Sequence, residues 1–116
     1  MIQQEPYDLM DEEAVKLPKN AVCRFLRETY GMSKQQADDA WGYLAKDQRV
    51  LVEFKHYIAT GSFVPASHCY KVQGYSAEQL CRTTCLTPLG AFNYLIYLQE
   101  RPEEALANLN AGLPRR

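Results

Sequence analysis

The sequence lacks any long apolar run and any excess of charge of one sign. Its longest uninterrupted apolar stretch, residues 94–98, has five residues, far fewer than the roughly 20 that a membrane-spanning helix needs. The 13 lysine and arginine residues nearly balance the 14 aspartate and glutamate residues, so no overall field attracts nucleic acid or anionic lipid. We therefore expect no membrane association, and we expect nucleic-acid binding to be disfavoured.

Export signals are also missing from the sequence. The first ten residues have neither the basic start nor the apolar core of a secretory signal. Without export, the four cysteines are expected to stay reduced rather than to form disulfides. They are Cys23, Cys69, Cys81 and Cys85. We therefore expect a protein of the cytoplasm with free thiols.

Histidine and glycine are too few to suggest a catalytic or nucleotide-binding site. A nucleophile activated by imidazole needs a nearby histidine, and the sequence holds only His56 and His68. We expect His56 on the polar face of a helix near Glu53. We expect His68 beside Cys69 in a loop, where adjacent side chains point in opposite directions. The six glycines are isolated, so no glycine-rich phosphate loop is present. We predict no catalytic residues, no cofactor, and a protein that is not an enzyme.

Cysteine and histidine suggest one set of metal ligands, which their spacing disfavours. Zinc sites use thiolate and imidazole ligands, commonly in pairs roughly two to four residues apart. The candidate ligands are His68, Cys69, Cys81 and Cys85. Adjacent residues rarely bind one ion together, and Cys81 and Cys85 lie one helical turn apart, as small core residues do. We predict no metal site. A metal- or thiol-dependent enzyme built on these four residues is the weakest of three hypotheses.

Length, composition and hydrophobic spacing indicate a single all-helical domain over residues 1–116. Of the 116 residues, 47% are hydrophobic and 23% charged, the balance of a globular protein with one core. Apolar residues recur at helical spacing between proline, serine and glycine boundaries. The segments are residues 18–31, 33–46, 48–60, 76–83, 88–99 and 102–112. The sequence predicts a compact all-α bundle of five to six short helices with a buried central helix near 88–99. Residues 1–17 would be a frayed tail or one short helix.

Residues 48–60 carry a pattern that fits either a helix or a strand. One set of residues alternates as in a strand, whereas Leu51, Phe54 and Ile58 recur at helical spacing. The alternating residues are Val50, Val52, Phe54, His56 and Ile58. The length of the segment, the lack of a second strand to pair with and Gly61 as a stop favour the helix. We predict a helix here.

Residues 76–95, which read SAEQLCRTTCLTPLGAFNYL, resemble a helix-turn-helix unit. Ser76 can cap a first helix, and Thr87 followed by Pro88 can start a second. Many such units bind DNA through polar side chains near the start of the second helix. The candidate contacts here are Arg82, Thr87 and Asn93, but cations do not outnumber carboxylates from residue 76 onward. A DNA-binding accessory protein is therefore the second hypothesis.

Tyrosine is the most prominent residue type. The sequence holds eight tyrosines, one tryptophan and four phenylalanines, and tyrosine is enriched at protein interfaces. The candidate interface residues are Tyr43, Tyr57, Phe63, Tyr70, Tyr75 and Tyr97. The competing interpretation is that these side chains ring the core and keep their hydroxyls in water. The leading hypothesis is a helical protein-interaction or regulatory module that binds a protein partner or a second copy of itself.

Overall fold

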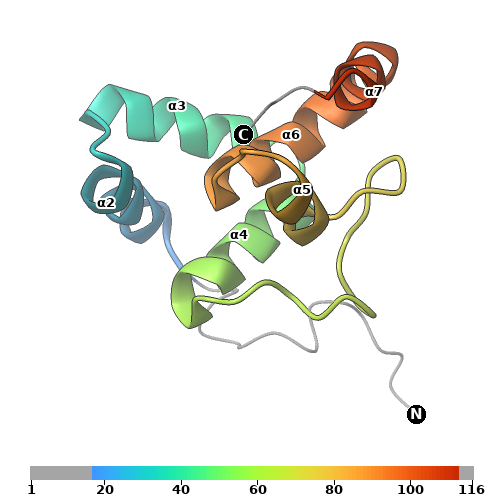
Figure 1. The fold of residues 1–116 in the computed structure, drawn as a ribbon. Helices are drawn as coiled ribbons and strands as arrows, with labels where there is room; N and C mark the ends of the chain where they lie inside the picture. Colours follow the sequence, from blue (N-terminus) through green and yellow to red (C-terminus); the bar gives the residue numbers. More distant parts are fainter. Residues whose placement is uncertain (1–16, 113–116) are drawn as a thin grey trace.

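Six helices and their connections make up residues 17–112, the part of the chain that the computed structural model describes (Figure 1). In chain order the helices are α2 (Lys19–Tyr30), α3 (Lys34–Leu44), α4 (Gln48–Thr60), α5 (Ala77–Thr83), α6 (Pro88–Glu100) and α7 (Pro102–Asn110). The loop of residues 61–76 holds an isolated bridge between Val72 and Tyr75, and no strand occurs between residues 17 and 112. The predicted all-α bundle is confirmed. The two alternatives for residues 1–17 fall outside the described range, apart from Leu17.

Local sequence signals explain where the helices begin and end. α3 begins at a capping box, in which the Ser33 hydroxyl accepts the Gln36 N–H at 3.1 Å and the Gln36 side chain accepts the Ser33 N–H at 2.9 Å. Gly31 ends α2 and Gly61 ends α4, with φ angles of 69° and 76°. Such left-handed geometry favours glycine because glycine has no Cβ. These boundaries agree with the predicted ones.

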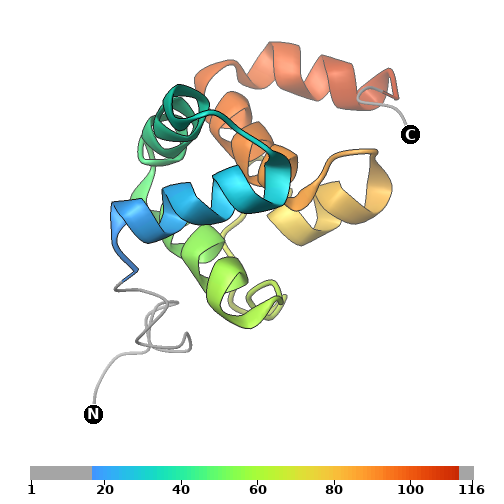
Figure 2. The same ribbon diagram turned by 90° about the vertical axis from the view of Figure 1, so that its left-hand side faces the viewer.

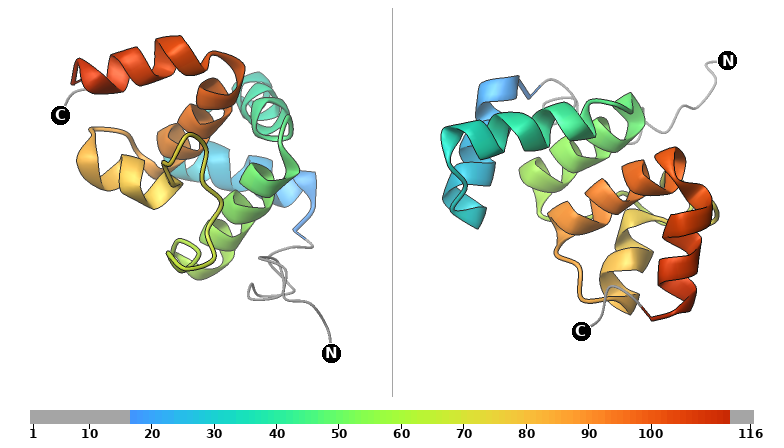
Figure 3. Two further views of the ribbon diagram at one scale, coloured as in Figure 1. Left: turned by 90° about the vertical axis from the view of Figure 1, so that its right-hand side faces the viewer. Right: turned by 90° about the horizontal axis from the view of Figure 1, so that it is seen from above.

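The ambiguous segment of residues 48–60 is the helix α4, and burial on two sides explains its mixed pattern. Leu51 and Phe54 belong to the main core, whereas Val52 packs with Val64 of the 61–76 loop in a separate small cluster. The loop runs back beside α4 before the chain enters α5 (Figure 3). Apolar residues are therefore needed on more than one face of the helix, which produces the alternation that resembles a strand.

Helix α6 is the centre of the bundle and packs against α3, α4, α5 and α7 (Figures 2 and 3). Its buried residues are Leu89, Ala91, Phe92, Tyr94, Leu95, Ile96 and Leu98. Three rings surround Phe92, at centroid distances of 5.5 Å for Phe54, 5.8 Å for Phe63 and 6.5 Å for Tyr57. The predicted buried central helix is confirmed, and aromatic contacts join it to α4 and to the 61–76 loop.

The pair formed by α2 and α3 lies on the opposite side of the bundle from α7 (Figure 1). Val22 and Leu26 of α2 and Ala37 of α3 are fully buried and belong to the main core. The polar side chains of the same two helices are left on the outer surface of the bundle. None of the described helices combines the length and the hydrophobicity that crossing a membrane requires.

Candidate binding site

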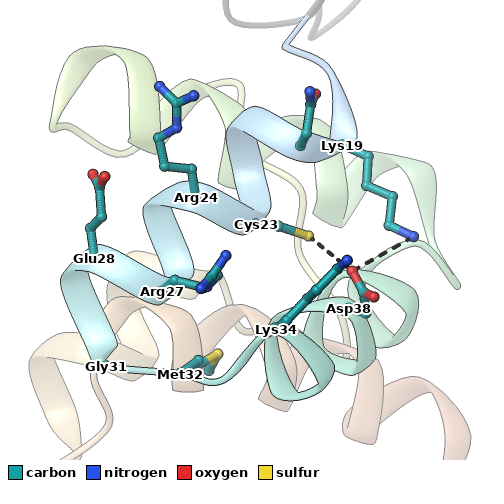
Figure 4. A pocket seen from close by; sticks show the side chains of 10 residues that line it. Lys19, Cys23, Arg24, Arg27, Glu28, Gly31, Met32, Lys34 and Asp38 are labelled. Carbon is teal, nitrogen blue, oxygen red and sulfur yellow. Dashed lines mark hydrogen bonds and ion pairs between the residues drawn. The ribbon is translucent and has the colours of Figure 1, made fainter.

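A cavity of about 860 Å³ opens between α2 and α3 (Figure 4). The residues that line it are Lys19, Asn20, Cys23, Arg24, Arg27, Glu28, Gly31, Met32, Lys34 and Asp38. α2 contributes along its whole length because residues three or four positions apart share one helix face. The left-handed turn at Gly31 then brings the start of α3 beside this face. The volume lies within the range of about 300 to 1,000 Å³ that is typical of binding pockets.

The lining of the cavity carries more positive than negative charge. Its cations are Lys19, Arg24, Arg27 and Lys34, and its carboxylates are Glu28 and Asp38. Lys19 forms a long ion pair, with Nζ 3.9 Å from Asp38 Oδ1. The other three cations form no ion pair with any carboxylate in residues 17–112. The cavity therefore concentrates positive charge in a chain whose net charge is -1.

Two of the three cations point toward the same space. Arg27 and Lys34 extend toward Cys23 and Asp38, whereas Arg24 extends away from them (Figure 4). Arg24, Arg27 and Lys34 are all exposed. A guanidinium group can hold a carboxylate or phosphate through two parallel hydrogen bonds, and an ammonium group adds a point charge. This arrangement can bind oxyanionic groups.

Cys23 is the nucleophilic side chain of the cavity, but its surroundings keep it protonated. Its Sγ lies 3.6 Å from Asp38 Oδ1. Burial, together with the hydrogen bond to Asp38, raises the pKa of the Cys23 thiol. Because the thiolate is the reactive form of cysteine, the chemistry of the cavity favours binding over covalent catalysis.

The structure brings together two of the six aromatic residues proposed for an interface. The rings of Tyr57 and Phe63 have centroids 5.0 Å apart, and both rings lie beside Phe92. All six residues are only partly buried and pack against the core. Tyr57 and Phe63 therefore extend the core toward the 61–76 loop.

The remaining four aromatic residues have separate partners within the chain. Lys46 Nζ lies 4.8 Å from the centre of the Tyr43 ring, and the Tyr70 hydroxyl accepts a hydrogen bond from Gln99 at 3.0 Å. The Tyr97 hydroxyl donates to the Glu104 carboxylate, and Tyr75 forms the isolated bridge with Val72. These contacts explain why the rings lie at the edge of the core. A role for them in an interface stays a prediction.

The three candidate DNA contacts lie in the α5 and α6 region, but they differ in accessibility. Arg82 and Thr87 are exposed, whereas Asn93 is half-buried and its Oδ1 atom is buried without a hydrogen-bond partner in residues 17–112. Leu89 and Phe92, which share the first turns of α6, are buried in the core. DNA contact by these residues stays a prediction, and α6 leaves few side chains near its start for reading bases.

Thr87 has a structural role that can be measured. Its hydroxyl accepts the Gly90 N–H at 3.1 Å and so caps α6. Replacing Thr87 with alanine is expected to lower the free energy of unfolding by about 1 kcal/mol, as measured by urea denaturation followed by circular dichroism. Thr87→Ser keeps the hydroxyl and serves as the matched control. Equal stability of the two variants would contradict the capping role.

The structure does not gather the four candidate metal ligands into one cluster. Within residues 17–112, no group of three or more histidine, cysteine, aspartate or glutamate side chains is placed to hold a metal ion. Cys69 and Cys81 each donate a hydrogen bond to a backbone carbonyl at 3.4 Å. His68 and Cys85 are exposed. The interpretation of Cys81 and Cys85 as small core residues fits Cys81, which packs against the core, but is wrong for Cys85, which is exposed and lies beyond the end of α5.

The prediction that His56 lies on a polar helix face near Glu53 is wrong, because both side chains are buried, with 9% and 4% of their surface exposed. Glu53 Oε2 accepts the backbone N–H of Tyr70 at 2.6 Å, which ties the 61–76 loop to α4. Burial raises the pKa of Glu53 to about 7, although the Tyr70 N–H opposes this effect. His56 Nδ1 is buried and has no hydrogen-bond partner in the described part of the chain. Glu53 is thus a buried carboxylate that anchors a loop.

A second polar cluster, formed by Asp47, Gln99 and the Tyr70 hydroxyl, also holds the 61–76 loop. The Asp47 carboxylate accepts hydrogen bonds from the Arg49 N–H, at 2.9 Å, and from the Gln99 amide, which also donates to the Tyr70 hydroxyl. Burial alone would raise the pKa of Asp47, but hydrogen bonds from Gln99 and Tyr70 outweigh burial and lower it. Tyr70 therefore connects the loop to both α4 and α6.

Comparisons with known proteins do not assign the cavity. No family model matches the chain, and no curated protein or solved structure matches it either.

Proposed function

We propose that the protein is a helical protein-interaction module that binds an acidic segment of a partner protein in the cavity between α2 and α3. The observation that carries this proposal is the group of three exposed cations, Arg24, Arg27 and Lys34, that surround one cavity and have no ion-pair partner in residues 17–112. Unpaired cations at a concave surface attract anions and accelerate their association.

A protein ligand suits the cavity better than a nucleic acid does. Duplex DNA carries one negative charge per about 1.7 Å of its axis, and a surface that binds it usually offers cations without interruption. Here Glu28 and Asp38 lie among the cations, and the whole chain carries a net charge of -1. Spaced carboxylates of a peptide can pair with the cations and avoid these two acidic side chains.

The apolar part of the lining also favours a peptide. Met32 and Cys23 line the cavity together with the cations, and both are half-buried. Methionine is unbranched and flexible, so it can adapt to side chains of different shapes. A ligand that combines acidic and apolar residues would use both kinds of surface.

A charge reversal in the cavity tests this proposal. The probe is a fluorescein-labelled peptide of repeated Asp-Glu-Leu, and a repeated Asn-Gln-Leu peptide is the neutral control. Fluorescence polarisation is expected to show binding of the acidic peptide by the wild type. The double variant R27E/K34E is expected to bind about ten-fold more weakly or worse, because two attractive pairs become repulsive. Raising the salt concentration to 0.5 M should weaken binding by the wild type because the cations are exposed to solvent.

The matched control variant is R82E, which reverses an exposed cation on α5 outside the cavity. It should bind the acidic peptide as the wild type does. Equal binding of the peptide by R27E/K34E and R82E would contradict the proposal. Tighter binding of duplex DNA than of the peptide, with R82E as the damaging variant, would support the DNA hypothesis instead.

A further inference from the structure

The segment that precedes α2 has the composition of a ligand for the cavity. Residues 1–16 contain five carboxylate side chains, whereas their cationic side chains are limited to Lys16. The acidic residues are Glu5, Asp8, Asp11, Glu12 and Glu13. Ile2, Tyr7, Leu9 and Met10 lie among them, so the segment combines acidic and apolar residues. This is the composition that the proposed function requires of a partner.

The segment joins the chain directly beside the cavity. It ends three residues before Lys19, the first residue of α2, whose side chain lines the cavity. Leu17 packs against the core and Pro18 is extended, with φ and ψ of -78° and 164°. The acidic segment is therefore attached at the end of the helix that forms most of the cavity lining.

The length of the segment is sufficient for it to cover the cavity. The 12 residues of α2 span about 18 Å at about 1.5 Å per residue. An extended chain spans about 3.3 Å per residue, so the eight residue steps from Glu5 to Glu13 can span more than the length of α2. The segment is therefore long enough for its five carboxylates to be distributed along the cations of the lining.

We propose that residues 1–16 bind in the α2–α3 cavity of the same chain and compete there with the acidic segment of a partner. This inference rests on the proposed function, because both ligands would use Arg27 and Lys34. A covalently attached ligand is present at an effective concentration on the order of 1 mM. If its intrinsic dissociation constant is about 0.1 mM, the attached segment lowers the apparent affinity for a partner about ten-fold.

The consequence for regulation is that partner binding depends on the charge of the segment. A partner with a higher density of carboxylates would displace the segment, whereas a weakly acidic one would not. Salt would weaken both interactions, because both depend on exposed charges. The segment therefore sets the minimum density of carboxylates that a partner needs in order to bind in the cavity.

The test compares the full chain with a full-length variant in which all five carboxylates are neutralised, E5Q/D8N/D11N/E12Q/E13Q. The labelled Asp-Glu-Leu peptide is expected to bind this variant about ten-fold more tightly than the wild type, as the competition above requires. Two smaller variants control for net charge, since each removes two carboxylates. E12Q/E13Q should bind more tightly than the wild type, and E78Q/E103Q, which alters α5 and α7, should bind within two-fold of it.

Nuclear magnetic resonance gives a readout that does not depend on the peptide. The backbone amide signals of Arg27 and Lys34 are expected to differ between the wild type and the variant with the neutralised segment. The signal of Arg82 on α5 should be the same in both proteins. Amide signals of Arg27 and Lys34 that do not move would overturn the inference, whether or not the peptide binds.

The failures of the two proposals can be told apart. Equal, measurable affinity of the wild type and the neutralised variant for the peptide would overturn the inference and leave the proposed function standing. Loss of peptide binding in both, with the amide shifts present, would overturn the proposed function but support binding of the segment. A wild-type dimer in sedimentation that dissociates on neutralisation would place the segment in the cavity of a second copy, and would overturn binding within one chain.

Discussion

Replacing Phe92 with alanine is expected to lower the free energy of unfolding by about 3 to 5 kcal/mol. Phe92 is fully buried on α6, and the rings of Phe54, Tyr57 and Phe63 surround it. Removing the ring would leave a cavity lined by three aromatic side chains that come from α4 and from the 61–76 loop. Single domains have total stabilities of about 5 to 15 kcal/mol, so this variant is expected to lose a large part of its stability. Urea denaturation followed by the far-ultraviolet circular dichroism of the helices measures the change.

A matched set of variants separates the size of the ring from its position. Phe92→Leu keeps an apolar side chain in the core and is expected to have a smaller effect than Phe92→Ala. Phe25→Ala removes a ring that is only half-buried, at a centroid distance of 6.0 Å from Phe54. It should therefore cost less stability than the change at Phe92. A loss below about 1 kcal/mol for Phe92→Ala would contradict the central position of this residue in the core.

Replacing Glu53 with glutamine is expected to make the protein more stable above pH 7. The pKa of Glu53 is about 7 in the folded protein because the side chain is buried, whereas its ordinary value is 4.5. Below pH 4.5 the Glu53 carboxyl group is protonated in both the folded and the unfolded protein, and its contribution to stability is fully present. As the pH rises through 7, the folded protein must hold a buried charge, and that contribution is lost. The difference between the two pKa values corresponds to at most about 3 kcal/mol.

The comparison of Glu53→Gln with the wild type is best made at pH 5, 6, 7 and 8. Glutamine keeps an oxygen that can accept the Tyr70 N–H, so the anchor of the loop is retained. The stability advantage of the variant should grow by about 1 to 3 kcal/mol between pH 5 and pH 8. Titratable groups that do not interact with Glu53 contribute equally to the two proteins and cancel in the difference. Glu103→Gln, on an exposed position of α7, is the control that should show no such growth. A constant difference across the range would contradict burial as the cause of the raised pKa.

Much of the fold could be predicted because local signals determine it. Ser33 with Gln36, Thr87, Gly31 and Gly61 act within one or two turns of the chain, and each has the role in the structure that its sequence context predicts. The central helix could be predicted because its apolar residues surround nearly its whole circumference. Even the choice of a helix for α4 depended on length and on a glycine stop, which are local properties.

The burial of Glu53 and His56 could not be predicted from the same signals. Both residues lie on the side of α4 that the periodic pattern assigns to solvent, and burial depends on a loop that follows them in the chain. Tyr70, which lies 17 positions further on, contributes the N–H that satisfies Glu53. Long-range contacts of this kind do not produce a regular spacing of apolar residues along the sequence. Val52 is apolar although it lies outside the main core, and this feature of the sequence indicates that a further segment covers this face of α4.

The cationic cavity was also missed, although its parts were visible in the sequence. The spacing of the apolar residues places Arg24 and Arg27 on the polar face of one helix, and Lys34 on the polar face of the next. Each assignment holds, since all three side chains are exposed. Only the packing of α2 against α3 brings the two faces together. A contrast between the cations of residues 19–34 and the acidic residues of 1–16 is the signal that could have identified this region.

The central position of α6 has a consequence for the synthesis of the protein. Helices α3 and α4 leave the ribosome before the central helix with which they pack, because α6 begins only at residue 88. Until then Leu44 and Phe54, which are fully buried in the finished fold, have no central helix to cover them. A nascent chain of this length exposes apolar surface in the way that favours aggregation or capture by chaperones. The interval between the emergence of α4 and the emergence of α6 from the ribosome thus sets how long the growing chain must be protected.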